Sequence, residues 1–177
     1  MRHHFFATIV FAALWSAPAA PSVLGEDAAS RGYRVLTEQP TLTSDFNQKV
    51  FDAAWKTWPE PLRSEAEKAS PAQRRQMAFE RYGLTSRPND SSDKPLQYVV
   101  DEDGNWTMNC FACHGGEVYG TPTPGAPNNR FALQTMTEEL RATKFRLGEP
   151  LSRMDLGALV IPPVSYTHLT LPTNRVA

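Results

Sequence analysis

Residues 109–116 read Asn109-Cys110-Phe111-Ala112-Cys113-His114-Gly115-Gly116. They contain the only two cysteines of the 177-residue chain, separated by two positions, and a histidine follows the second cysteine directly. The pattern C-x-x-C-H is the attachment signature of a c-type haem. Each thiol can add to a vinyl group of the porphyrin, and the adjacent imidazole can bind the iron as the proximal axial ligand. The stretch therefore predicts one covalent haem c per chain, held by Cys110, Cys113 and His114.

Three other interpretations use the same cysteines: a zinc site, a dithiol redox pair and a structural disulfide. A structural zinc site needs about four ligands, and no second C-x-x-C or H-x-x-x-H pattern follows in the sequence. A thioredoxin-like pair opens a helix after a strand, within alternating strands and helices, and the sequence shows no such alternation. The histidine after Cys113 favours haem, with a structural or redox disulfide as the main alternative.

The N-terminal residues have the three-part layout of a secretory signal peptide. Arg2 precedes an apolar run over residues 5–15, and small residues follow this run. We expect residues 1–25 to act as the signal, with cleavage after Ala19 or Gly25, and an uncleaved anchor as the alternative. The protein is then exported to the periplasm or another extracytoplasmic space. Covalent c-type haem assembly takes place in such compartments, so the two predictions support each other.

The composition limits the classes of partner. The formal net charge is −1, and the sequence holds no basic patch that indicates nucleic acid or anionic lipid. We therefore expect no nucleic acid, no membrane span beyond the signal segment, and a redox partner protein or a further haem domain. The chain has 15 prolines against 10 glycines, which favours short helices joined by stiff loops.

Residues 26–95 predict an N-terminal helical region. Residues 26–40 are polar without a sustained period, so we expect an extended segment there. Apolar residues recur at three- and four-residue spacing from Phe46 to Trp58, which predicts an amphipathic helix that begins near residues 43–45. A further turn or two of helix is expected over residues 62–68.

A second, clearly delimited helix is predicted from Ser70-Pro71 to Gly83, with a serine cap at one end and a glycine cap at the other. We expect Arg74, Arg75 and Arg81 on its solvated face. Docking of an acidic redox partner on these cations is the alternative.

The sequence also predicts how the chain enters and leaves the cysteine motif. Leu96, Tyr98 and Val100 alternate with other side chains, and residues 101–104 then form a turn. Residues 96–108 therefore predict a small β-hairpin that delivers the chain to Cys110. Residues 120–129 predict a rigid, proline-fixed loop, which can present a carbonyl to the far nitrogen of His114. A helix is expected from about residue 135 to Gly148.

Residues 110–116, the loop behind them and the following helix resemble the haem-binding half of a class I-type cytochrome c domain. Residues 105–163 are also similar to the first haem module of large exported bacterial multi-haem cytochrome c proteins. The resemblance implies a mainly α fold, with an incomplete cytochrome c-like haem region over residues 96–163, preceded by short amphipathic helices and a small β-hairpin. It also implies that His114 is proximal and that a methionine is distal.

Met154 is the tentative distal ligand, because it lies forty residues past His114 and is the best placed methionine by spacing. A plain packing role for Met154, or a ligand outside this chain, are the alternatives. Residues 164–177 resemble the conceptual translation of sequencing-adapter DNA rather than natural protein sequence. We therefore expect this tail to be an artefact and the natural protein to continue beyond Pro163, and we discount His168 as a ligand.

The leading functional interpretation is covalent haem binding and electron transfer outside the cytoplasm. One alternative is a haem module of a multi-haem oxidoreductase, either peroxidase-like or linked to a dehydrogenase. Another is a structural or sensor haem. No acid–base pair or conventional nucleophile indicates a catalytic residue, so the sequence leaves open whether the protein is an enzyme.

Overall fold

Helices and short strands follow one another through residues 27–160, which are the part of the chain that the computed structural model describes. The helices are α1 Ala28–Glu38, α2 Gln48–Ala53, the 3-10 helix η1 Ala54–Thr57, α3 Leu62–Lys68, α4 Pro71–Tyr82, α5 Phe111–His114, α6 Leu133–Leu147 and α7 Arg153–Val160. The strands are β1 Phe46–Asn47, β2 Tyr98–Val100, β3 Asn105–Met108, β4 Gly115–Val118 and β5 Thr121–Pro124. The predicted signal segment and the predicted artefactual tail lie outside the described residues.

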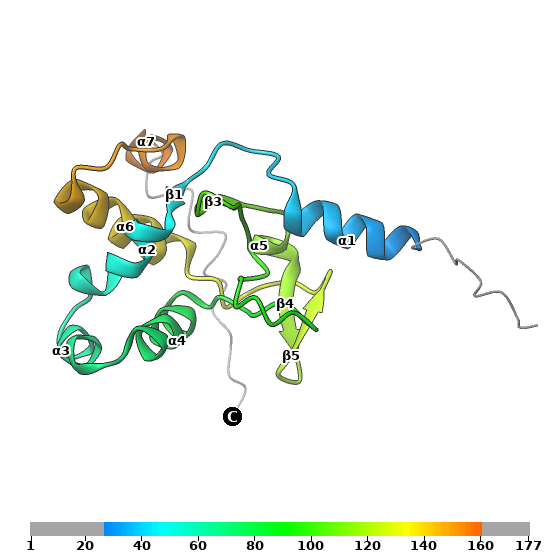
Figure 1. Ribbon diagram of the computed structural model, residues 1–177, viewed down its shortest axis with the longest axis horizontal. Coiled ribbons are helices and arrows are strands. Elements are labelled where there is room, and N and C mark those ends of the chain that lie inside the picture. The colour runs from blue at the N-terminus through cyan, green and yellow to red at the C-terminus, as the bar shows by residue number, and fades with distance from the viewer. Residues whose placement is uncertain (1–26, 161–177) are drawn as a thin grey trace, which may run out of the picture.

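The strands make two antiparallel sheets, one of three strands in the order β1-β3-β2 and one of two strands, β4-β5. Figure 1 shows α2, α3, α4 and α6 gathered on one side, and α5 with the β4-β5 hairpin on the other. The fold is therefore mixed α/β, and the expectation of a mainly α, cytochrome c-like domain is wrong.

The β4-β5 hairpin contributes to this correction, because β5 lies within residues 120–129, where the sequence predicted a rigid loop. Its two-residue turn is Tyr119-Gly120, with φ of 49° and 76°, as a tight hairpin turn requires. Val118 pairs with Thr121 beside the turn, so the alternation of an antiparallel pair puts both prolines of β5 at non-hydrogen-bonded positions. Proline is tolerated there because its missing N–H would point away from the partner strand.

The three-stranded sheet confirms the hairpin predicted over residues 96–108 and adds a strand to it. Phe46 of β1 pairs with Trp106 of β3, and Asn47 pairs with Asn105. The predicted amphipathic helix therefore begins later than expected: the side chain of Asn47 accepts a hydrogen bond of 3.0 Å from the N–H of Val50 and caps α2.

Helix α1 occupies residues for which the sequence predicted an extended segment. The Asp27 carboxylate caps it by accepting from the N–H groups of Ala29 and Ser30. At its other end the buried guanidinium of Arg87 donates to the carbonyls of Thr37 (2.8 Å) and Tyr98 (2.9 Å). That prediction was wrong because it overlooked two local signals, the Asp27 cap and the amphipathic pattern of residues 28–38. Arg87, fifty positions from Thr37, adds an anchor at the other end of the helix.

The predicted limits of α4 and α6 agree with the structure. Ser70 and Gln73 form a reciprocal capping box at the start of α4. Gly83 and Gly148 end the two helices in the left-handed conformation, with φ of 64° and 67°. The helix predicted over residues 62–68 is α3.

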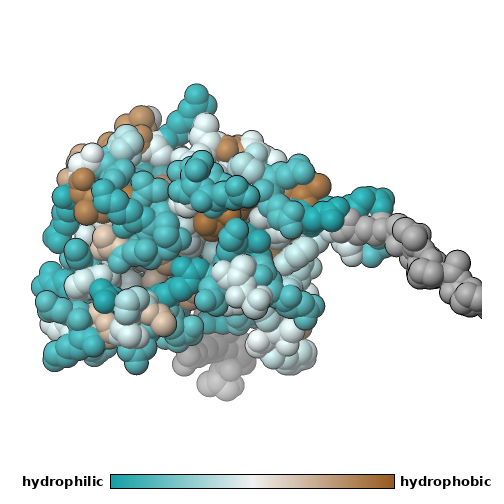
Figure 2. All heavy atoms as spheres, in the orientation of Figure 1, coloured by the Kyte–Doolittle hydropathy of each residue, from teal (hydrophilic) through white to brown (hydrophobic). Residues whose placement is uncertain are grey.

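Aromatic rings hold the helices on the three-stranded sheet. The ring of Phe51 stacks on Trp106 with centroids 4.4 Å apart, while Phe46 and Tyr98 lie 5.3 and 5.6 Å from the same ring. Each buried ring contributes about 2 kcal/mol through the apolar surface that it removes from water. Outside this core, the face seen in Figure 2 is mainly hydrophilic, with scattered hydrophobic residues.

A buried polar network joins α4, α6 and η1. The indole N–H of Trp58 donates to the hydroxyl of Tyr82 (2.8 Å), which donates to the carboxylate of Glu139 (2.9 Å). Arg81 forms an ion pair with the same carboxylate, so it does not lie on a simple solvated face as expected. Burial raises the pKa of the Tyr82 phenol, which keeps the hydroxyl protonated as a donor.

A second buried network fastens α7 to α6. The ammonium of Lys144 forms an ion pair with Asp155, donates to the hydroxyl of Ser152 (3.3 Å) and donates to the carbonyl of Asp45. The side chains of Lys144 and Asp155 are only 4% and 3% exposed. Loss of one partner would leave a buried charge uncompensated, so the pair fixes the position of α7.

Replacing either capping glycine should reduce stability, but Gly83→Ala far more than Gly148→Ala. Both residues need positive φ, which costs alanine about 1 kcal/mol. A Cβ at Gly83 would also lie 2.0 Å from the carbonyl oxygen of Arg130, whereas at Gly148 it meets nothing within 4 Å. We expect a loss of about 3 kcal/mol or more for Gly83→Ala in urea unfolding. Equal losses in the two variants would contradict this packing.

Asp45→Asn should make the protein at least as stable as the wild type at neutral pH. Burial raises the pKa of Asp45, although its carboxylate accepts a hydrogen bond from the N–H of Met108 and is attracted by Lys144. A carboxyl with a raised folded-state pKa stabilises the fold while protonated, and this contribution is lost as pH rises through that pKa. Asparagine keeps the acceptor and cannot ionise.

The measurement is urea unfolding of both proteins between about pH 4 and pH 7. The wild type should lose stability relative to the Asp45→Asn variant as the pH rises. A difference that does not change with pH would show that the carboxyl titrates at its ordinary value.

Candidate haem attachment site

The cysteine motif consists of Cys110, the N-cap residue, and α5, a single short turn of helix that follows it. Asn109 fixes the start of this turn. The side-chain oxygen of Asn109 accepts from the N–H of Phe111 (2.8 Å), and its amide donates to the carbonyl of Leu96 (3.0 Å). The backbone N–H of Asn109 donates to the carbonyl of Gln97 (3.0 Å). Strand β3 therefore delivers the motif at a defined position, as the predicted hairpin requires.

The five residues from Cys110 to His114 divide into a buried spacer and three exposed functional side chains. Phe111 and Ala112 are 6% and 4% exposed, and the Phe111 ring packs against Tyr33 of α1 with centroids 5.8 Å apart. Cys110, Cys113 and His114 are exposed, and both thiols are free. The spacer thus anchors the turn in the core, while the groups predicted to hold haem face solvent.

The hairpin and the loop after it hold the other end of the motif. The N–H of Gly125 donates to the carbonyl of His114 (2.6 Å), and that of Asn128 donates to the carbonyl of Cys113 (2.9 Å). A Cβ at Gly116 would lie 2.2 Å from the carbonyl oxygen of Pro127, so the glycine is needed for close packing of the chain on itself. The loop after β5 therefore contacts the motif through backbone hydrogen bonds. A contact between a loop carbonyl and the imidazole ring of His114 stays a prediction.

Gln97 is the residue of this site that sequence reasoning missed. Its side chain is fully buried. The amide oxygen accepts from the N–H of Thr85 (3.0 Å), and the amide nitrogen donates to the Thr85 hydroxyl (3.1 Å) and the Gly115 carbonyl (3.3 Å). Gln97 therefore connects the loop after α4 to Gly115, the residue that follows His114. The only signal in the sequence is a polar side chain between the apolar Leu96 and Tyr98.

The structure does not bring Met154 to the motif. Met154 lies at the start of α7 and lines a small cavity with Tyr98, Met136 and Lys144, and α7 packs against α6. Figure 1 shows α7 apart from α5. Ligation of the iron by Met154 therefore remains a prediction of the sequence.

The residues present fit a covalently attached haem. Attachment requires two accessible thiols, and binding of the iron requires one accessible imidazole beside them. Those are the three side chains that α5 exposes. Among residues 27–160, no group of three or more histidine, cysteine, aspartate and glutamate side chains could hold a metal ion. Within the same range, none of the helices is long and apolar enough to cross a membrane.

No known family, curated protein or solved structure matches this chain. The functional argument therefore depends on the motif and on its placement in the fold.

Gln97→Leu should destabilise the protein by about 3 kcal/mol, because it leaves the buried Thr85 N–H and Gly115 carbonyl without this partner. Leucine keeps the approximate shape, so the loss reports the hydrogen bonds. Gln134→Leu is the matched control: Gln134 is exposed on α6 and donates only to Glu138. Urea unfolding should show a change within about 0.5 kcal/mol for this control. Similar values for the two variants would contradict the role of Gln97.

Proposed function

We propose that this protein carries one c-type haem, bound covalently through Cys110 and Cys113 with His114 as proximal iron ligand, and that it transfers electrons outside the cytoplasm. The observation that carries the proposal is the exposure of these three side chains around a buried spacer. The proposal rests on these three residues alone. It does not require a cytochrome c-like domain, which the mixed α/β fold is not.

Attachment uses the two thiols of α5. Each sulfur forms a bond to one carbon of a vinyl group, and the thiol hydrogen passes to the other carbon of the same double bond. The exposed thiols are accessible for this addition, which a buried thiol would not be. When bound, the haem supplies an iron that cycles between Fe(II) and Fe(III).

The chain itself would hold His114 in place. The ring must be neutral to bind iron, and its backbone is held through the hydrogen bond from Gly125 to its carbonyl. Gln97 fixes the next residue through the carbonyl of Gly115. A rigid attachment supports electron transfer because it keeps the redox group at a constant distance from the surface that a partner contacts.

A partner is expected at the exposed side of α5. Both cysteines and His114 lie at the surface, so a haem held by them would be close to a docking protein or to a further haem domain. The predicted signal peptide places this exchange in the periplasm or another extracytoplasmic space. The formal net charge of −1 gives no strong long-range field to select the partner.

Co-expression with c-type maturation machinery should yield a protein that retains one haem after denaturation, measured by mass spectrometry. The double variant Cys110→Ser, Cys113→Ser should retain none, and each single variant should retain haem through one thioether. Tyr119→Ser, at the exposed tip of the β4-β5 hairpin, is the control and should retain haem like the wild type. A wild-type protein without covalent haem, or with a disulfide between its two cysteines, would refute the proposal.

Met154→Ala tests the tentative distal ligand. If Met154 binds the iron, the substitution converts a low-spin to a high-spin spectrum. An unchanged spectrum would remove Met154 from the site and leave it the packing role that its cavity beside Met136 and Lys144 indicates.

A further inference from the structure

Three charged side chains from different segments of the chain meet beneath α7, and we call them the Asp45 cluster. Lys144 of α6 forms an ion pair with Asp155 of α7, and its ammonium also donates to the backbone carbonyl of Asp45, the residue before β1. The Asp45 carboxylate accepts a hydrogen bond of 3.0 Å from the N–H of Met108. The cluster therefore contains two carboxylates and one ammonium.

Little water can reach this cluster. The side chains of Lys144 and Asp155 are 4% and 3% exposed. All three residues of the cluster line one small cavity of about 10 Å³, which has room for about one water molecule. A charge that is not balanced in such a place is costly, because it has lost its hydration. The cluster is neutral while one carboxylate is protonated, and it carries one excess negative charge when both are ionised.

The other titratable groups near Asp45 do not balance this charge. Tyr98 lines the same cavity, and burial raises the pKa of its phenol, which keeps it neutral. Glu149, in the linker between α6 and α7, lines the neighbouring groove together with Asp45 and forms an ion pair of 2.8 Å with Lys49. The proton on Asp45 therefore responds mainly to the ion pair of its own cluster.

Helix α7 depends on the Asp45 cluster for its attachment. It packs against α6 at the edge of the molecule (Figure 1). Among residues 153–157, only the side chain of Asp155 is buried, and Leu156 beside it is 52% exposed. The linker to α7 begins at Gly148, where the space that a Cβ would occupy has no neighbour within 4 Å. Loss of the ion pair would thus release α7 on a linker that can move.

The proton on Asp45 is coupled to the docking of α7. Burial is the main cause of the raised pKa of Asp45, and the charge of Asp155 raises this pKa further. Lys144 opposes both effects, but it belongs to α6 and is present whether or not α7 is docked. Docking therefore favours the protonated form of Asp45, and by reciprocity the loss of that proton weakens docking by the same free energy. This contribution is present at low pH and is lost as the pH rises.

We propose that Asp45 and the Lys144–Asp155 ion pair form a proton-controlled latch, which holds α7 on α6 while Asp45 is protonated and loosens when Asp45 ionises. The ionised Asp45 repels Asp155 and competes with it for the single ammonium. The latch acts through local opening of α7, without global unfolding. The proposal is independent of haem attachment.

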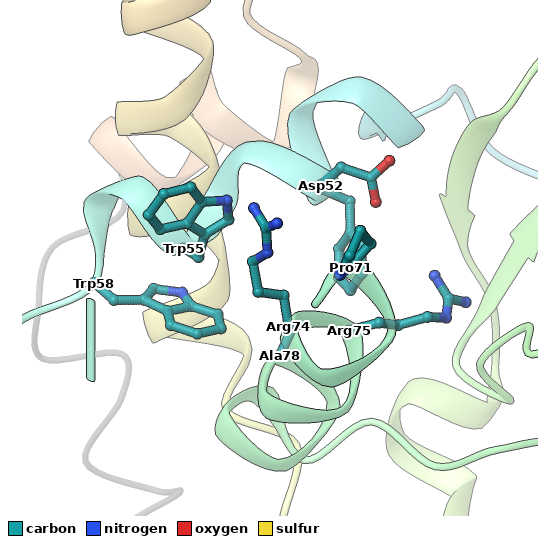
Figure 3. A pocket seen from close by; sticks show the side chains of 8 residues that line it. Asp52, Trp55, Trp58, Pro71, Arg74, Arg75 and Ala78 are labelled. Carbon is teal, nitrogen blue, oxygen red and sulfur yellow. The ribbon is translucent and has the colours of Figure 1, made fainter. Parts of the chain in front are cut away.

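The charged side chains that line the groove between α2-η1 and α4 are arranged differently (Figure 3). The guanidinium of Arg74 lies over the Trp55 ring at 5.1 Å, and that of Arg75 lies over the Phe79 ring at 4.9 Å. The expectation that these two arginines lie on a solvated face is thus wrong, since both are partly buried. Asp52 of the same groove is exposed, so water hydrates its charge and it provides a matched control.

Hydrogen exchange of the full chain, followed by mass spectrometry between about pH 4.5 and pH 7.5, tests the latch. After correction for intrinsic rates, exchange over residues 153–160 should rise at least about threefold with pH and should be faster than in α4. In Asp45→Asn the rate over α7 should not depend on pH, because asparagine cannot ionise. Asp52→Asn should behave like the wild type. A rate without pH dependence in the wild type, or equal rates in α7 and α4, would overturn the proposal.

The reciprocal measurement is the titration of Asp45, followed by NMR of its carboxyl carbon. Asp155→Asn should lower the pKa of Asp45, because it removes the neighbouring negative charge, whereas Asp52→Asn should leave this pKa unchanged. An equal pKa of Asp45 in Asp155→Asn and in the wild type would also refute the latch. If Asp155→Asn does not fold, as judged by circular dichroism, the exchange rates of the wild type and Asp45→Asn decide.

Discussion

The buried amide of Gln97 is the constraint on which the candidate haem site depends. It satisfies the backbone of Thr85 on one side and the carbonyl of Gly115 on the other. The backbone carbonyl of the same residue accepts from the N–H of Asn109, whose side-chain oxygen accepts from the N–H of Phe111 at the start of α5. Through its side chain and its backbone carbonyl, a single residue therefore connects the loop after α4 to both ends of the motif. Because the groups bonded to the Gln97 amide are buried, each must keep its partner, which restricts the motion of the motif.

This constraint explains how three reactive side chains can be exposed without making the segment mobile. The core binds α5 through Phe111 and Ala112, and the backbone carbonyls of Cys113 and His114 are held by the chain that follows β5. Stability thus comes from the spacer and from the backbone. The side chains of Cys110, Cys113 and His114 are exposed and both thiols are free, so they are accessible for chemistry.

Local signals in the sequence predicted the elements that depend on local interactions. Ser70, Pro71 and Gly83 delimit α4, and the turn after Val100 delimits the β2-β3 hairpin, because caps and turns involve residues close in the chain. Helix α1 was missed although its Asp27 cap is a local signal. The site residue Gln97 was not predicted, because its partners lie 12 to 18 positions away. The prediction that Arg74 lies on a solvated face failed for a similar reason. Helical periodicity identifies a polar face, but it does not show that Trp55, from another helix, covers that face.

The largest error, the fold class, follows from what the C-x-x-C-H pattern requires. Two thiols and one imidazole need only a short turn of helix, a buried spacer and an open side. Many scaffolds can supply such a turn, so the pattern carries chemistry without specifying a fold. Here the chain leaves the motif through Gly115 and Gly116 into a hairpin, since both glycines lie too close to neighbouring backbone for any side chain. The same two glycines could equally have indicated a close approach to a porphyrin. What distinguishes the two interpretations is the position of the carbonyls of Phe111 and Pro127, which only the folded chain reveals.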